Sequence, residues 1–374
     1  MRLTRGNSPL QRIPSDYYPA NGGFWFMIPD GTDRHKKMFY RDNYPGNRWN
    51  GDTVVLVHGN PECSYSFRKI ISAMERNAGK PFRVVAMDHI GFGLSDQAAF
   101  EMTCADHAAN LLHLIRYLDL RNVTLVVHDW GGPIGIGAFL QDPGRISNLV
   151  LLNTTVFTIP DEGYTYHKNY PLPFFPWSKF PSVFPDRLWG AVASYTVSRT
   201  PARTPTLVFG MLLHLVLSEL GIRSGADREA PQVYEGQFRS VANARSSKRM
   251  VRETKYWGTG KNPAGSSADM RIPAVFYRFI QQNIANAWGP SGDNIGIRAL
   301  IGRWDPLGKD EVIHQWIAHL PQLEGHVQVF ERVGHFVNIE KPEKIADAVL
   351  ELGFRLRKHT IPREAASRGI LQRS

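Results

Sequence analysis

Cysteine is scarce in this sequence: Cys63 and Cys104 are the only two among 374 residues, and they form no Cys-x-x-Cys pair. A disulfide scaffold is therefore excluded, and we expect two buried thiols in their reduced form. The N-terminal segment lacks the apolar stretch of a secretory signal peptide, which favours a cytoplasmic location. No metal-ligand spacing is present, so no metal site is predicted.

Long hydrophobic runs are also missing. The longest extends from Leu207 to Leu217 and contains Gly210 and His214. A helix that crosses a bilayer needs about 20 apolar residues, so this run is too short and we expect no membrane association. Nevertheless 43% of the residues are hydrophobic, which is enough for a large core and excludes a chain that is disordered throughout.

Acidic residues are outnumbered, because 34 Asp and Glu oppose 44 Lys and Arg and leave a net charge of +10. Much of the excess lies in the tail from Arg355 to Ser374, and a second basic cluster lies between Arg245 and Lys255. Such runs are usually solvated, and no zinc-finger, RNP or helix-turn-helix signature accompanies them. We predict no nucleic-acid binding, and the pattern leaves the oligomeric state open.

Short, β-branched apolar runs alternate with stretches of helical periodicity. The expected strands are 53–58, 82–88, 123–129, 146–153, 297–302 and 326–331, and the expected helices are 64–76, 103–118, 131–140, 309–319 and 342–352. Continuous apolar strands that alternate with helices are typical of a mostly parallel sheet covered on both faces. The sequence therefore predicts the α/β class.

The alternation stops between residues 156 and 290, where Pro-rich, helical and then polar segments follow one another. We interpret this stretch as a helical cap inserted into a core made of residues 1–155 and 291–374. The Leu207–Leu217 run is expected to line the inner face of the cap, and the alternative is plain packing between helices. Residues 245–270 form an additional polar, basic piece.

One motif stands out at the end of the strand predicted at 123–129. His128-Asp129-Trp130-Gly131-Gly132 lies where a buried strand turns directly into a helix. A side chain at such a nucleophile elbow projects above the sheet, and small neighbours allow the sharp bend. Here the elbow position holds Asp129. A carboxylate suits attack on a saturated carbon that carries a leaving group, which gives an alkyl ester of the enzyme.

Hydrolysis of that ester needs a base and a group that orients it. His335 follows the last predicted strand, and Asp305 follows the strand at 297–302. The chain order of nucleophile, acid and histidine matches that of the α/β hydrolases. Each residue alone could be structural, Asp129 as a helix N-cap for example, but all three follow predicted strands.

Asn60 and Trp130 are the candidates for the oxyanion and leaving-group site. Asn60 follows the strand at 53–58, and Trp130 follows Asp129. Their backbone N–H groups could hold an oxyanion, and their side-chain N–H groups are neutral donors that suit a departing halide. The alternatives are a turn residue before Pro61 and a packed aromatic ring.

Four segments resemble the haloalkane dehalogenases of the α/β-hydrolase superfamily: His58-Gly59-Asn60-Pro61, Val-Val-His-Asp-Trp-Gly-Gly at 126–132, Gly302-Arg303-Trp304-Asp305 and Gly334-His335-Phe336. The resemblance covers about residues 50–155 and 295–352. It implies an α/β-hydrolase fold with a large helical cap after the sixth strand.

The same resemblance implies roles for the site residues. Asp129 would be the nucleophile, His335 the base, Asp305 its acid partner, and Asn60 with Trp130 the halide site. The acid at 305 is similar to the third subfamily, since residues 153–155, Asn-Thr-Thr, offer no carboxylate at the alternative place. The expected partners are a small haloalkane or epoxide-like substrate and water, with no cofactor.

Two other functions stay open at this point. An epoxide hydrolase would share the triad and use cap tyrosines as acids, and the candidates are Tyr164, Tyr166, Tyr170, Tyr195, Tyr234 and Tyr256. Epoxide hydrolases usually have an aromatic residue at the place of Asn60 and a glycine at that of Val127, which favours the dehalogenase reading. A catalytically silent binding scaffold would not need the five-residue constellation.

Overall fold

An eight-stranded sheet forms the centre of the computed structural model, which describes residues 4–18, 22–45, 49–159, 179–198, 206–220, 229–253 and 268–355. The strands are β1 (Gly23–Met27), β2 (Lys37–Asp42), β3 (Thr53–Val57), β4 (Arg83–Met87), β5 (Val123–His128), β6 (Ile146–Leu152), β7 (Gly296–Trp304) and β8 (Val327–Gly334). Their order is β1-β2-β4-β3-β5-β6-β7-β8. The pairs from β4 to β8 are parallel, whereas β2 is antiparallel to both neighbours. The six predicted strands and the α/β class are confirmed.

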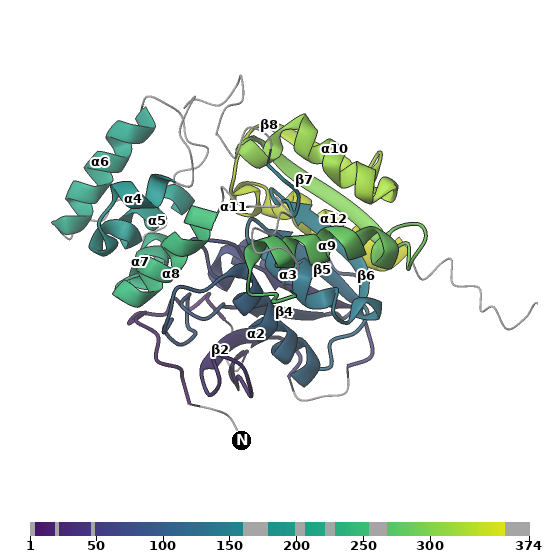
Figure 1. Ribbon diagram of the computed structural model, residues 1–374, viewed down its shortest axis with the longest axis horizontal. Coiled ribbons are helices and arrows are strands. Elements are labelled where there is room, and N and C mark those ends of the chain that lie inside the picture. The colour runs from purple at the N-terminus through teal and green to yellow at the C-terminus, as the bar shows by residue number, and fades with distance from the viewer. Residues whose placement is uncertain are drawn as a thin grey trace, which may run out of the picture.

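Helices cover both faces of this sheet (Figure 1). They are α1 (Arg68–Asn77), α2 (Cys104–Tyr117), α3 (Gly131–Phe139), α9 (Pro273–Trp288), α10 (Asp310–His319), α11 (Val337–Glu340) and α12 (Pro342–Arg355). Alternate residues of β3 serve the two faces. Val54 and Leu56 join the apolar cluster that holds α1 and α12, and Val55 and Val57 join the cluster that holds α2, α3 and α9. Burial on both faces explains why β3 is apolar throughout.

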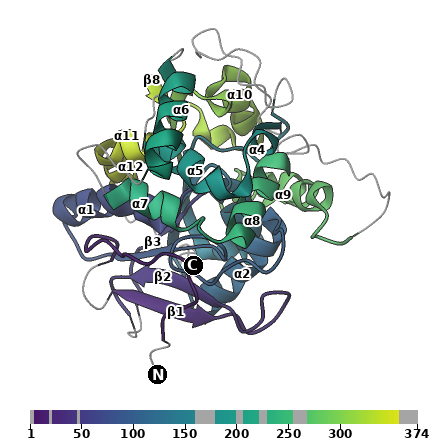
Figure 2. The ribbon, with the colours of Figure 1, turned by 90° about the vertical axis from the view of Figure 1, so that its left-hand side faces the viewer.

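A second group of helices follows β6: α4 (Phe180–Val183), α5 (Trp189–Ser198), α6 (Thr206–Glu219), α7 (Glu229–Gly236) and α8 (Val241–Arg252). We call α4–α8 the insertion helices. They gather at one side of the sheet in Figure 1 and face the viewer in Figure 2. Helix α9 falls within the predicted 156–290 segment but contacts α2 and α3 of the core. The domain limits themselves remain a prediction.

The expectation for the Leu207–Leu217 run is wrong. This run lies in α6, and Phe209, Leu212, Leu213 and Val216 of that helix are exposed. The sequence is apolar on all sides of the helix, so its pattern did not identify the face that packs inward. Among the described side chains of the helix, Leu215 is buried. Among the described residues, no helix has the length and apolarity needed to cross a membrane.

The cysteine prediction is confirmed, because Cys63 and Cys104 are both buried and free. Three other segments of the sequence analysis lie outside the described residues. They are the tail beyond Arg355, most of the polar piece after Glu253, and the Pro-rich stretch from Pro160 to Ser178.

The predicted sharp turn from strand to helix is present between β5 and α3. Asp129 has a φ of 52°, a left-handed conformation that is uncommon for a residue with a side chain. The next two positions leave no room for one. A Cβ on Gly131 would lie 2.2 Å from the Val57 carbonyl oxygen, and a Cβ on Gly132 would lie 1.9 Å from Thr154 Oγ1. The glycines therefore permit the close packing that holds Asp129 above the sheet.

We expect Gly131→Ala to lower the free energy of unfolding by about 1–3 kcal/mol, because the methyl group would collide with backbone atoms of β3. Gly144→Ala is the matched control, since a Cβ there meets nothing within 4 Å. Urea unfolding followed by circular dichroism measures both. Equal stability of the two variants would contradict the argument.

Candidate active site

Three of the predicted residues meet at the carboxyl ends of the strands. Asp129 follows β5, Asp305 follows β7 and His335 follows β8. His335 Nδ1 lies 2.7 Å from Asp305 Oδ2, and His335 Nε2 lies 3.4 Å from Asp129 Oδ1. One imidazole ring thus connects two carboxylates that are 176 positions apart in the sequence.

Asn60 completes the surroundings of the Asp129 carboxylate. The Asn60 backbone N–H donates to Asp129 Oδ2 at 2.8 Å. Therefore Oδ2 is held by the main chain, while Oδ1 is the oxygen that faces His335. Thr154 Oγ1 donates to the Asp129 backbone carbonyl at 2.6 Å and fixes the elbow from below.

Asp305 is oriented by Asn153, which lies in the 153–155 segment that offers no carboxylate. Asn153 Nδ2 donates to Asp305 Oδ2 at 2.7 Å, and it also donates to the Gly302 carbonyl at 2.9 Å. Asn153 Oδ1 in turn accepts from the Gly302 N–H at 2.7 Å. Asn153 does not supply the acid, but it holds the strand end that does.

Two opposing effects set the pKa of His335. Burial by itself lowers this pKa, whereas the charges of Asp305 and Asp129 and their hydrogen bonds to the ring raise it. The carboxylates prevail, and the pKa of His335 lies well above its usual range. The two carboxylates therefore favour the protonated ring, and loss of the charge of either one favours release of its proton.

A buried pair, His128 with Glu62, lies next to this site, and no local pattern in the sequence indicates it. His128 Nδ1 lies 2.6 Å from Glu62 Oε2, and His128 Nε2 lies 2.9 Å from the His335 carbonyl oxygen. The carbonyl oxygen can only accept, so Nε2 donates to it, while Nδ1 and the Glu62 carboxyl share the other hydrogen bond. Asn338 Nδ2 donates to the other oxygen of Glu62 at 2.7 Å. The pair ties the segment that carries His335 to the strand that carries Asp129.

Burial alone would raise the pKa of Glu62, but the adjacent His128 and the hydrogen bonds that it accepts lower it overall. Both side chains of the pair are fully buried. A buried ion pair is costly to break, because the remaining charge has no partner and no water.

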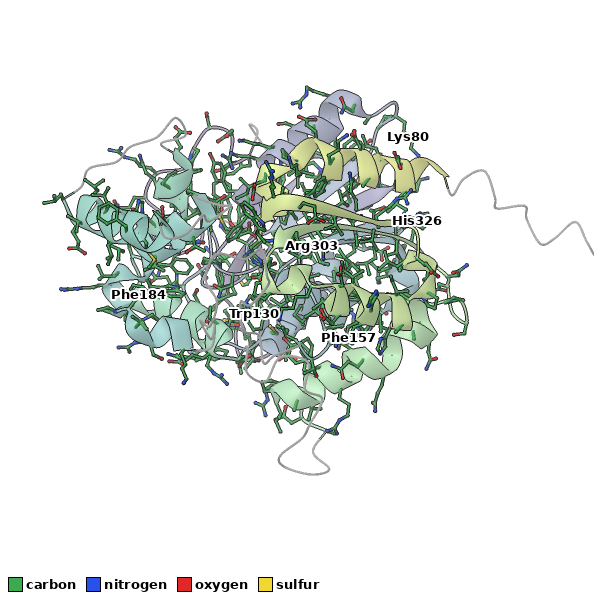
Figure 3. All side chains as sticks on the ribbon, turned by 90° about the horizontal axis from the view of Figure 1, so that it is seen from above. Lys80, Trp130, Phe157, Phe184, Arg303 and His326 are labelled. Atoms are coloured by element: carbon green, nitrogen blue, oxygen red, sulfur yellow. The ribbon has the colours of Figure 1, made fainter. Side chains whose placement is uncertain are left out.

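The side chain of Asn60 is engaged with the insertion helices. Its Nδ2 donates to the Ser247 carbonyl of α8 at 3.1 Å, and its Oδ1 accepts from the Ser247 hydroxyl. Trp189 Nε1 of α5 donates to the same hydroxyl at 2.8 Å. An amide nitrogen has two N–H groups and Ser247 takes one of them. Trp130 is 3% exposed and lies near the centre of the view in Figure 3.

The two predicted cap tyrosines that the structure describes, Tyr195 and Tyr234, pack against other aromatic rings. Tyr234 lies in an apolar cluster with Tyr65, at 6.3 Å between ring centroids, and Tyr195 packs against His214 of α6 at 5.4 Å. Tyr164, Tyr166, Tyr170 and Tyr256 lie outside the described residues. Tyr277 of α9, which was not considered, is nearer to the site. Burial raises its pKa, and Cys104, Glu253 and more weakly Asp129 add to that effect.

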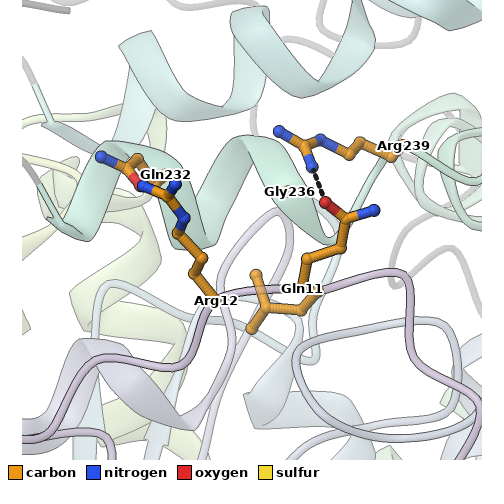
Figure 4. A pocket seen from close by; sticks show the side chains of 6 residues that line it. Gln11, Arg12, Gln232, Gly236 and Arg239 are labelled. Carbon is orange, nitrogen blue, oxygen red and sulfur yellow. Dashed lines mark hydrogen bonds between the residues drawn. The ribbon is translucent and has the colours of Figure 1, made fainter.

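A separate hollow of about 350 Å³ lies between the N-terminal segment and α7 (Figure 4). It is lined by Leu10, Gln11, Arg12, Gln232, Gly236 and Arg239. Arg239 Nη1 donates to Gln11 Oε1 at 3.1 Å across it. None of the five candidate site residues lines this hollow.

Comparison with known proteins agrees with this architecture. Residues 52–342 match the model of the alpha/beta hydrolase fold family. The chain belongs to this family. Its curated relatives include haloalkane dehalogenases and oxetanone decarboxylases.

The chain is 29% identical over 297 residues to a cis-3-alkyl-4-alkyloxetan-2-one decarboxylase of Shewanella oneidensis, covering 78% of each chain. It is 29% identical over 311 residues to haloalkane dehalogenase 1 of Mycobacterium bovis, covering 79% of this chain and 82% of the relative. The solved structure of a haloalkane dehalogenase from Paraglaciecola agarilytica is similar in fold, with a TM-score of 0.61 at 21% identity over 96% of this chain and 100% of the other.

We expect Asp129→Asn to lower the pKa of His335, because the substitution removes a negative charge 3.4 Å from Nε2. Since the raised pKa reflects a stabilised imidazolium, the stabilising contribution of His335 is full below its ordinary pKa of about 6.5 and is lost as the pH rises through the folded-state value. NMR titration of the histidine ring measures the shift. An unchanged titration would show that Asp129 does not act on the ring.

Glu62→Ala should destabilise the protein by about 3 kcal/mol, because it leaves the fully buried Nδ1 of His128 without the carboxyl group that binds it. The depressed pKa of Glu62 means that its contribution is present above pH about 4.5 and is lost as the pH falls through the folded-state value. Glu343→Ala is the control, since Glu343 and its partner Arg76 are 58% and 59% exposed and the substitution should matter by less than about 1 kcal/mol. Denaturant unfolding at several pH values compares the variants.

Proposed function

We propose that this protein hydrolyses the carbon–halogen bond of haloalkanes through an alkyl ester on Asp129. The observation that supports this best is the position of His335 between Asp129 and Asp305. A carboxylate that attacks carbon becomes an ester, and hydrolysis of an ester requires a base that activates water. The His335–Asp305 pair supplies that base next to the nucleophile.

In the first step Asp129 Oδ1 attacks the carbon, a carbon–oxygen bond forms and the halide leaves with the electron pair of the broken bond. The Asn60 N–H keeps Oδ2 in place, so that Oδ1 is the oxygen available for attack. We assign the halide to the Trp130 indole N–H and to the second amide N–H of Asn60. Neutral N–H donors suit this task, because they stabilise the halide by hydrogen bonds without pairing it with a positive charge.

In the second step water attacks the ester carbonyl carbon, and His335 takes its proton. The carbonyl oxygen is then Oδ2, so the Asn60 N–H stabilises the negative charge that develops on it. Formation of the ester has removed the charge of Asp129, which lowers the pKa of His335 and lets the ring act as a base. Collapse of the intermediate breaks the bond to the alkyl oxygen, which takes the proton from His335 and leaves as the alcohol. The carboxylic acid of Asp129 then loses its proton to solvent and is again a carboxylate.

A second candidate comes from the Shewanella oneidensis relative, whose name describes decarboxylation of a dialkyl oxetanone. The same first step would open such a four-membered lactone. Asp129 would attack the ring carbon that bears the ester oxygen, and the freed carboxylate would remain on the product. Loss of carbon dioxide would then form the carbon–carbon double bond and return the electron pair of the ester bond to Asp129. This route consumes no water.

Epoxide hydrolysis has less support. Of the predicted cap tyrosines within the described residues, Tyr234 and Tyr195 make the packing contacts reported above and no described contact with Asp129. Ring opening of an epoxide needs an acid that protonates the ring oxygen, which these two tyrosines do not supply in this arrangement.

The discriminating experiment uses His335→Gln and Asp129→Ala with a panel of brominated alkanes and a cis-dialkyl oxetanone. For a dehalogenase, bromide release by the wild-type protein falls about 10⁴-fold or more in Asp129→Ala. His335→Gln completes only the first step, so mass spectrometry finds the protein increased by the mass of one alkyl group. Asp119→Ala is the control, since it changes an exposed carboxylate outside the candidate site and should leave bromide release unchanged.

The two candidate functions differ in the behaviour of His335→Gln. If His335→Gln still forms the alkene from the oxetanone, and no haloalkane releases bromide, the function is assigned to lactone decarboxylation and not to dehalogenation. Turnover of brominated alkanes by His335→Gln at the wild-type rate would contradict the ester mechanism altogether.

A further inference from the structure

Three polar side chains connect helix α8 of the insertion to the core. Asn243, Ser246 and Ser247 are spaced by three and four residues, which places them on one face of the helix, and each is at most 1% exposed. Asn243 Oδ1 accepts from the Ala98 N–H at 2.9 Å, and Ser246 Oγ accepts from the Met102 N–H at 3.2 Å. Two of the three side chains therefore bind main-chain groups of the segment between β4 and α2.

The third residue, Ser247, binds a side chain of the candidate site instead. Its carbonyl oxygen accepts from Asn60 Nδ2 at 3.1 Å, and its hydroxyl donates to Asn60 Oδ1. Because both bonds go to one residue, they use the edge of the amide that carries Oδ1 and the adjacent N–H. The N–H that remains lies beside Cβ, nearer the Asn60 main chain, whose own N–H binds Asp129 Oδ2.

Trp189 of α5 determines the direction of the Ser247 hydroxyl. An indole N–H can only donate, and Trp189 Nε1 donates to the hydroxyl oxygen at 2.8 Å. The single proton of the hydroxyl is then directed to Asn60 Oδ1. A flipped amide would place Oδ1 against the Ser247 carbonyl, which can only accept. Since Ser247 and Trp189 are buried, such an unpaired arrangement is costly, and one orientation of the amide is selected.

We propose that Ser247 is a positioning residue, which orients the Asn60 amide so that its remaining N–H is available to the leaving halide. The residue acts through Asn60. This assignment rests on the proposed function, which gives that N–H its task. It extends the proposed function because it places a determinant of halide affinity on α8, among the insertion helices.

Halide binding to the full chain tests this proposal without turnover. Line broadening of the chloride NMR signal measures the affinity of the wild-type protein, of Ser247→Ala and of Ser246→Ala. We expect Ser247→Ala to weaken chloride binding about tenfold, because Asn60 Oδ1 loses its donor and the amide is no longer confined to one orientation. Ser246→Ala is the matched control. It removes an equally buried hydroxyl from the same helix face, but that hydroxyl binds Met102, so the chloride affinity should stay unchanged.

Both variants are expected to fold, since alanine is favourable in a helix, and their unfolding temperatures check this. Wild-type chloride affinity in Ser247→Ala would overturn the proposal. An equal loss of affinity in Ser246→Ala would also overturn it, because a general loosening of α8 would then explain both results.

Asn60→Ala separates a failure of this proposal from a failure of the proposed function. If chloride binding is lost in Asn60→Ala and retained in Ser247→Ala, the halide site stands and the role of Ser247 is wrong. If the wild-type protein binds no chloride, the halide site is wrong, and the role of Ser247 is wrong with it.

Discussion

The charge of the Asp129 carboxylate is the constraint on which the rest of the site depends. This side chain is 6% exposed, and an unpaired carboxylate in such a place is strongly disfavoured. A backbone N–H from the β3 loop and the imidazole from the β8 loop compensate it. The left-handed turn at Asp129 and the two glycines after it make this approach sterically possible. The turn geometry and the groups that compensate the charge therefore both depend on the position of Asp129 after β5.

The compensation is also what would drive the proposed reaction forward. As long as Asp129 is ionised, the raised pKa of His335 keeps the ring protonated and the carboxylate oriented. An alkyl ester at the same atom carries no charge, so it no longer raises the pKa of His335. The ring can then lose its proton at the step that needs a base. Asp305, held by Asn153, keeps the ring in position through this change. The His128–Glu62 pair keeps the backbone of His335 in place in the same way.

The sequence predicted the parallel part of the fold well, because β3 to β8 are apolar runs that end in recognisable loops. It did not predict β1 and β2, whose burial comes from their partners. Arg41 and Asp42 of β2 are buried, and Asp42 pairs with Arg83 of β4, although charged residues at a strand end usually indicate solvent. The buried pair next to the site was missed for a related reason. Glu62 and His128 lie 66 positions apart, and nothing local to either residue indicates the other.

Among the candidate site residues, the sequence indicated which side chains would gather but not what else would bind them. Asn60 illustrates the difference, because it has two partners in two parts of the molecule. Its backbone N–H holds Asp129, and its amide binds Ser247 of α8, which in turn binds Trp189 of α5. A displacement of α8 must either break the two hydrogen bonds between Asn60 and Ser247 or carry Asn60 with it. The second case moves the donor that binds the Asp129 carboxylate, so the insertion helices and this carboxylate are mechanically coupled through this one residue.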